Sequence, residues 1–220
     1  MPEPNFPEPS EGQPPAAPQE HRLQLRHSAM DDASEALRRL CLDPVYIANR
    51  EWGVPRWGHP EGTLGAHIEE LEANLKRARP WLLEGDEARL RLIVHAHDIC
   101  KPEARKGVSS EDPLHHGRLA RQLLARYSTD SQALAIVEHH DDGYYLFFQD
   151  DPSPGIERLL AAVEEVELFL LFTFIDGCLA GKLPQPVQWF AEQLARHRPL
   201  GQRVMECFSF LSQSRQEGVG

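Results

Sequence analysis

The sequence is short of positive charge. Its 220 residues include 23 Lys and Arg against 34 Asp and Glu, so that the formal net charge is −11. A protein that follows the phosphate backbone of a nucleic acid needs a basic stripe, so we expect no extended nucleic-acid partner. A small anionic substrate would have to be attracted locally, by metal ions and a few Lys or Arg side chains.

Closely spaced cysteine pairs and long apolar runs are lacking as well. The four cysteines, Cys41, Cys100, Cys178 and Cys207, lie far apart and form no CxxC pair, and no secretory segment is visible. These absences predict reduced thiols in a cytoplasmic protein. The longest apolar stretch, residues 168–175, is far too short to cross a bilayer, so we expect no membrane association.

The alternation of apolar and polar residues that marks a β-strand is also missing, whereas helical spacing of apolar residues recurs. Helices are expected at about 30–49, from a Thr63 N-cap onward, and at 155–180 and 184–212. The predicted fold is therefore all-α, a compact helical bundle over residues 21–213. Residues 1–20 are rich in Pro and Glu and are expected to form a disordered tail, and residues 214–220 a flexible one.

Metal-capable side chains recur as a spaced series through the helical region: His67, His97-Asp98, His115-His116, His139-His140 and Asp176. Each gap is long enough for a helix and a turn, and each helix offers a His on its apolar stripe. Imidazole with carboxylate is the ligand mix of transition-metal hydrolytic sites. Burying so many imidazoles without a common partner would leave many polar atoms unsatisfied. We therefore expect the series to converge on a metal cluster in the core.

Asp176 strengthens this interpretation. It directly follows Leu-Phe-Leu-Leu-Phe-Thr-Phe-Ile, the most apolar stretch of the chain. A carboxylate in such surroundings has to be paired or has to bind a cation.

The motifs around these residues resemble those of a known family. LIVHAHDICKPE looks like the defining motif of the HD-domain superfamily of metal-dependent phosphohydrolases, and HPEGTLGAH resembles the first-histidine region of the HD domains attached to tRNA nucleotidyltransferases. HHGRLA resembles the middle histidine motif, IVEHHDDG the next, and FIDGCLAG the final aspartate motif. The resemblance runs from about His59 to Lys182 in the family's order.

The resemblance implies a bundle of the HD-domain type with a metal site in its core. Its minimal one-metal set matches His67, His97, Asp98 and Asp176. The extra ligands of two-metal members match His116, which fits the motif better than His115, together with His139, His140 or both. Lys101 is placed equally well to touch a phosphate and to form a salt bridge at a helix end, and we count it with His97 and Asp98 as a catalytic candidate.

The implied activity is hydrolysis of a phosphomonoester or a cyclic phosphodiester, nucleotide-like by family analogy. Two divalent ions (Mn, Fe, Zn or Mg) bridged by Asp98 would activate the attacking water. The rival interpretation is a non-catalytic regulatory HD module that binds metal and nucleotide and recruits a protein partner through the Pro-rich tail. The sequence does not indicate an oligomeric state.

Two further expectations concern residues near this site. Cys100 stands where the family has a Gly, which predicts an ordinary backbone after Asp98 and a small core residue there. Trp52 and Trp57 lie in an irregular connection, where we expect them to pack under a loop rather than to form a lid over a base.

Overall fold

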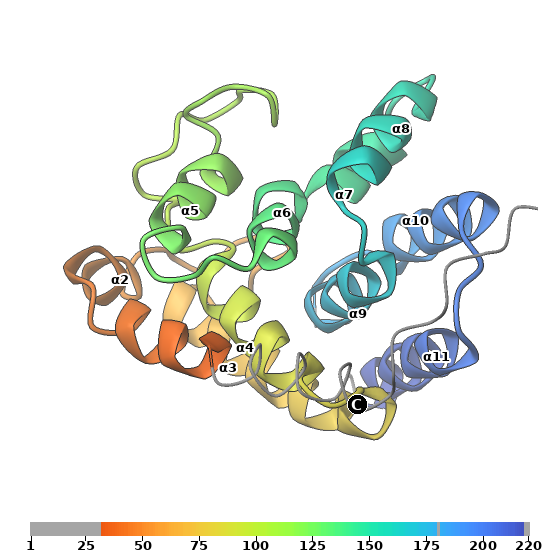
Figure 1. The fold of residues 1–220 in the computed structure, drawn as a ribbon, viewed down its shortest axis with the longest axis horizontal. Helices are drawn as coiled ribbons and strands as arrows, with labels where there is room; N and C mark the ends of the chain where they lie inside the picture. The colour runs from red at the N-terminus through yellow and green to blue at the C-terminus, as the bar shows by residue number, and fades with distance from the viewer. Residues whose placement is uncertain (1–31, 180, 218–220) are drawn as a thin grey trace, which may run out of the picture.

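The computed structural model describes residues 32–179 and 181–217, and in this part of the chain helices joined by short loops account for the fold (Figure 1). No β-strand occurs among these residues, where Arg56 and His59 form one isolated bridge. The all-α prediction is confirmed. The predicted tail over residues 1–20 lies outside the described residues.

Along the described part of the chain, one helix follows another. A helix over 32–40 precedes α2 (Pro44–Asn49), α3 (Leu64–Ala78), the 3-10 turn η1 (Arg79–Trp81), α4 (Asp86–Ala96), α5 (His116–Leu124), α6 (Ser131–His139), α7 (Asp142–Phe147), α8 (Ser153–Ala162), α9 (Val166–Gly177), α10 (Pro184–His197) and α11 (Gln202–Glu217). None of the helices in the described residues is long and apolar enough to cross a membrane.

Helix α9 is the centre of the core. Its residues are apolar on all sides, and Phe169, Leu170, Leu171, Phe172 and Phe174 are completely or almost completely buried. A helix that is apolar all round has to be covered on every face. Helices α3, α4, α10 and α11 pack against it and provide this cover. Asp176 therefore comes at the end of the most deeply buried helix in the described structure.

Short polar side chains fix where several helices begin. Thr63 caps α3 as expected, its hydroxyl accepting a hydrogen bond from the Ala66 amide at 3.2 Å. Asp43 caps α2 in the same way, and Asp130 caps α6. Since α3 and α6 carry histidines of the series, these caps also fix where the imidazoles lie.

Each of the segments 30–49, 155–180 and 184–212, predicted as one helix apiece, is divided between two helices. The segment 30–49 breaks before α2, where Asp43 is the cap and Pro44 the first helical residue. The segment 184–212 breaks between α10 and α11, where Pro199 and Gly201 interrupt the pattern. Helix α11 then continues to Glu217, past the predicted end of the bundle at residue 213.

The break within 155–180, between α8 and α9, contains no Pro or Gly that would predict it. Between α8 and α9, the backbone amides of Glu164 and Glu165 donate instead to the side-chain oxygen of Gln132, at 2.8 and 3.1 Å. Gln132 belongs to α6, so a contact distant in sequence replaces the helical hydrogen bonds. Helical periodicity alone could not have predicted it.

The close packing of α5 on α6 generates a prediction. A Cβ atom on Gly117 would lie 2.5 Å from the backbone oxygen of Glu138, which cannot move without shifting α6. We expect Gly117→Ala to lower the free energy of unfolding by about 1–3 kcal/mol despite the better helix propensity of Ala. Urea unfolding followed by circular dichroism measures this. Gln122→Ala, on the exposed side of the same helix, should change stability by less than about 0.5 kcal/mol.

Candidate metal centre

The ends of several helices bring the predicted ligands together. His67 comes from α3, His97 and Asp98 from the end of α4, His116 from the first residue of α5, His140 from the residue after α6, and Asp176 from the end of α9. The four histidines and Asp98 are buried, and the Asp176 side chain is 19% exposed. Segments far apart in the sequence thus deliver one cluster of imidazoles and carboxylates.

The carboxylate of Asp98 lies between two pairs of histidines. Its Oδ2 faces one pair, 3.4 Å from His97 Nε2 and 3.9 Å from His67 Nε2. Its Oδ1 faces the other pair, 3.2 Å from His140 Nε2 and 3.5 Å from His116 Nε2. Asp98 thus presents one carboxylate oxygen to each pair of histidines.

His97 and His140 are oriented by the same backbone device. The Nδ1–H of His97 donates to the carbonyl of Val94 at 2.9 Å, and that of His140 to the carbonyl of Val137 at 2.8 Å. Each Nε2 then faces the cluster, and in the neutral ring it is the atom without a proton, with a free lone pair. A backbone carbonyl on the second ring nitrogen is the usual orienting contact of a metal-binding histidine.

His67 has close neighbours but no well-aligned hydrogen bond. Glu61 Oε1 lies 2.9 Å from its Nδ1, and Asp176 Oδ1 lies 3.2 Å from its Nε2. Neither contact has the direction of a hydrogen bond, and both ring nitrogens are buried, as is the unpaired Nε2 of His97. Buried polar atoms normally have partners, so these nitrogens indicate that a further group belongs between them.

The structure separates the paired histidines that the sequence left open. His140 joins the cluster, whereas His139 lies outside it, with its Nδ1 2.7 Å from Asp142 Oδ2 in a separate recess. His116 Nε2 lies 3.1 Å from His140 Nε2, in agreement with the preference for His116. His115 caps α5, and its ring lies tilted against that of His116; it is buried, and its ligand atom lies within 4.8 Å of those of His116 and Asp141.

Two side chains at the site, Asp141 and Glu61, were missed by sequence reasoning. Asp141 places one oxygen 3.1 Å from His116 Nε2 and the other 3.6 Å from His140 Nε2. Glu61, almost fully buried, contacts both His67 and His59 at 2.9 Å. Asp141 directly follows the histidine pair and Glu61 lies inside HPEGTLGAH, so proximity to the motifs was the available signal.

Two lysines pair with the carboxylates of the cluster. Lys101 forms a short ion pair with Asp98 Oδ2, and Lys182 lies 2.5 Å from Asp176 Oδ1. Lys101 therefore forms a salt bridge, which is one of the two roles predicted for it beside phosphate binding. Both lysines also line the adjacent pocket, so their ammonium groups remain close to any anion bound there.

The charges at the site shift the pKa values of its groups strongly. Burial opposes the ionised form of Asp98, but Lys101 and the surrounding histidines outweigh it and hold its pKa well below the usual range. For His140, Asp141 and Asp98 outweigh burial and raise its pKa to about 9. Burial lowers the pKa of His97, because no counter-charge compensates fully. A metal ion must therefore displace a proton at His140 while His97 offers a neutral imidazole.

The donor set fits a metal ion. Ligand atoms of His67, His97 and Asp176 lie within 4.8 Å of one another, and so do those of Asp98, His116 and His140. Each group offers two imidazole nitrogens and a carboxylate oxygen, a combination of donors found in metal sites. Metal binding would also provide partners for the unpaired nitrogens of His67 and His97. These buried His and Asp groups could thus hold a metal ion.

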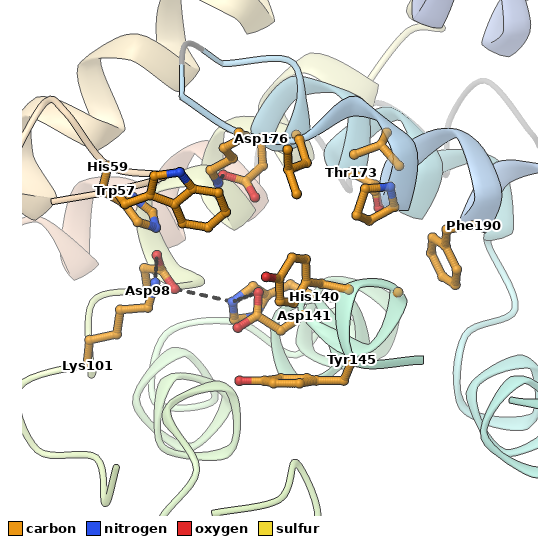
Figure 2. A pocket seen from close by; sticks show the side chains of 18 residues that line it. Trp57, His59, Asp98, Lys101, His140, Asp141, Tyr145, Thr173, Asp176 and Phe190 are labelled. Carbon is orange, nitrogen blue, oxygen red and sulfur yellow. Dashed lines mark hydrogen bonds and ion pairs between the residues drawn. The ribbon is translucent and has the colours of Figure 1, made fainter. Parts of the chain in front are cut away.

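A pocket of about 270 Å³ opens beside the cluster (Figure 2). Asp98, His140, Asp141 and Asp176 line one part of it, and Trp57 and Tyr145 flank it from opposite sides. The expectation that Trp57 packs under a loop is wrong, because its side chain is 74% exposed at the pocket mouth. Cys100 behaves as expected, as a buried core residue, and burial raises the pKa of its thiol to about 12.

The two adjacent histidines after α6 allow a matched test of this centre. We expect His140→Gln to lose metal relative to the unaltered protein, because its Nε2 faces Asp98 and His116. His139→Gln should keep the full metal content, because its ring contacts Asp142 outside the cluster. Elemental analysis of untagged protein reconstituted with Mn measures both. Equal loss of metal in the two variants would contradict the assignment.

Comparison of the chain with protein-family models, curated proteins and solved structures finds no match. The resemblance of the motifs to the HD-domain superfamily therefore stays a prediction from the sequence.

Proposed function

We propose that the chain is a metal-dependent phosphohydrolase of the HD-domain type, acting on a phosphomonoester or cyclic phosphodiester. The observation that carries the proposal is the Asp98 carboxylate, with one oxygen facing His67 and His97 and the other facing His116 and His140. This bridging position adjoins a pocket that a small substrate can enter.

The ligands divide into two sets that share Asp98. His67, His97 and Asp176 would hold one ion, and His116 and His140, with Asp141 beside them, the second. Divalent metals bound there would polarise a phosphoryl oxygen and acidify a water molecule for attack on phosphorus. The cluster offers more than the four ligands that a structural zinc site uses, and it contains no thiolate. Both features favour a catalytic role.

The lysines supply the remaining charge that a phosphate ester needs. Lys101 and Lys182 line the pocket from two sides of the cluster, each held at a carboxylate that would also bind metal. Their ammonium groups can orient the nonbridging oxygens of the substrate and stabilise the charge that develops on them. This local arrangement explains how a chain with a net charge of −11 could bind an anion.

The proposal predicts that Asp98→Asn abolishes activity. The purified protein, loaded with Mn, Fe or Zn, should hold more than one metal equivalent and hydrolyse members of a panel of nucleotides and simple phosphoesters. Asp98→Asn keeps the volume but removes the charge that both ligand sets share, so we expect a loss of at least about 1,000-fold in kcat/KM and a lower metal content.

The same experiment separates the proposal from the rival regulatory module. A module that only binds would take up metal and nucleotide but would turn over no ester under any metal. Metal content near zero after reconstitution, or wild-type activity in Asp98→Asn, would contradict the whole scheme.

A second prediction concerns Asp176, which pairs with both His67 and Lys182. In chelator, Asp176→Asn should lower the free energy of unfolding by about 1–3 kcal/mol, because Lys182 loses its charged partner. In added Mn, the variant should also lose the extra stability that metal gives the unaltered protein. Thermal unfolding under both conditions measures this.

Asp142→Asn is the matched control for Asp176→Asn. Asp142 is a similarly buried carboxylate that contacts a histidine, His139, outside the cluster. The Asp142→Asn variant should be less stable than the unaltered protein in chelator and should still gain stability from Mn. If Asp176→Asn also kept the full gain from Mn, Asp176 would not be a ligand.

A further inference from the structure

The pocket beside the cluster has two chemically different parts. One part carries the carboxylates, His140 and the two lysines. The other part is a wall of apolar side chains from α10 and the turn before it: Leu183, Pro186, Val187 and Phe190. Figure 2 shows Phe190 at the opposite side of the pocket from Asp98 and Lys101. A ligand whose phosphate lies at the cluster would thus direct its organic group along this wall.

Two glycines hold the wall in place. A Cβ atom on Gly143 would lie 2.7 Å from the ring of Phe190, and one on Gly177 would lie 2.3 Å from a methyl of Val187. Helix α10 therefore approaches α7 and the end of α9 as closely as glycine allows. The wall is packed and preformed, so it can receive an apolar group without first being ordered.

Hydrogen-bonding side chains are scarce along this wall. Among the described residues that line the pocket there is no Asn, Gln, Ser or Arg. The hydroxyl of Thr173 already donates to the carbonyl of Phe169 at 2.9 Å. The other polar-tipped groups outside the cluster are His59, which contacts Glu61 at 2.9 Å, and the aromatic residues Trp57, Tyr144 and Tyr145, which are partly exposed at the mouth. Polar atoms of a ligand placed against the wall would lose their bonds to water without replacement.

We propose that the substrate is a phosphomonoester of an apolar, ring-sized alcohol rather than a nucleotide. This inference rests on the proposed phosphohydrolase function and names the class of ester. A flat apolar ring fills the space between the wall and the aromatic rim, where Tyr145, 43% exposed, offers a ring contact. A ribose and a base present many donors and acceptors for which the wall has no partners.

The size of the pocket supports a compact ester. Its volume of about 270 Å³ falls just below the range of roughly 300–1,000 Å³ typical of pockets for drug-sized ligands. The phosphate and the ions proposed at the cluster occupy part of that space. The remainder accommodates about one ring and a short linker.

The test compares three esters of primary alcohols, so that the leaving groups have similar intrinsic reactivity: 2-phenylethyl phosphate, glycerol 3-phosphate and AMP. With the Mn-loaded full chain we expect kcat/KM for 2-phenylethyl phosphate to exceed that for each of the other two by about tenfold or more, the factor gained by burying a ring. AMP hydrolysed as well as or better than 2-phenylethyl phosphate would overturn this inference and leave the phosphohydrolase proposal standing. No hydrolysis of any of the three esters would overturn this inference, and the phosphohydrolase proposal would fall with it only if cyclic phosphodiesters were not hydrolysed either.

A pair of leucine variants tests whether the preference for an apolar ester arises at the wall. Leu183 lines the pocket and is 42% exposed, so Leu183→Ala should fold normally and lower the kcat/KM ratio of 2-phenylethyl to glycerol phosphate by about threefold or more. Leu83, 41% exposed and distant from this pocket, is the matched control, and Leu83→Ala should leave the ratio unchanged. An unchanged ratio in Leu183→Ala would overturn the assignment of the wall as the binding surface.

Discussion

The burial of the Asp98 carboxylate is the constraint on which the rest of the structure depends. An ionised carboxylate inside a protein is tolerated only where opposite charges or hydrogen-bond donors surround it. Lys101 pairs with one oxygen and His140 contacts the other, and His67 and His116 face the same group. The helices that carry these residues therefore have to meet at one point. The bundle is arranged around a charge as much as around an apolar core.

The ends of helices, rather than their middles, deliver most of this cluster. The last carbonyls of a helix have no partner within it, and an imidazole N–H in the following turn can provide one. His97 and His140 do so with the carbonyls of Val94 and Val137, three residues back in each case. One contact thus completes a helix end, fixes the tautomer and directs Nε2 to the cluster.

The sequence predicted the all-α class and most of the cluster, because buried imidazoles at helical spacing need a common partner. It could not choose between His139 and His140 by periodicity, although Val-x-x-His, shared by Val94–His97 and Val137–His140, points to the second. Glu61 and Trp57 lie in a loop, where no periodicity tells which side chains face inward. The break between α8 and α9 depends on Gln132, a tertiary contact without a local signal.

Charge balance connects the acidic site to the anionic substrate proposed for it. As metal ligands the histidines are neutral, so Glu61, Asp98, Asp141 and Asp176 contribute four negative charges and the two pocket lysines two positive ones. These groups thus sum to two negative charges before the metal ions are counted. The two divalent ions proposed there would reverse the balance to two positive charges, which would match the dianion of a phosphomonoester. Affinity for the anion would then depend on the metals, while the apolar wall of α10, which carries no charge, would discriminate among the alcohols.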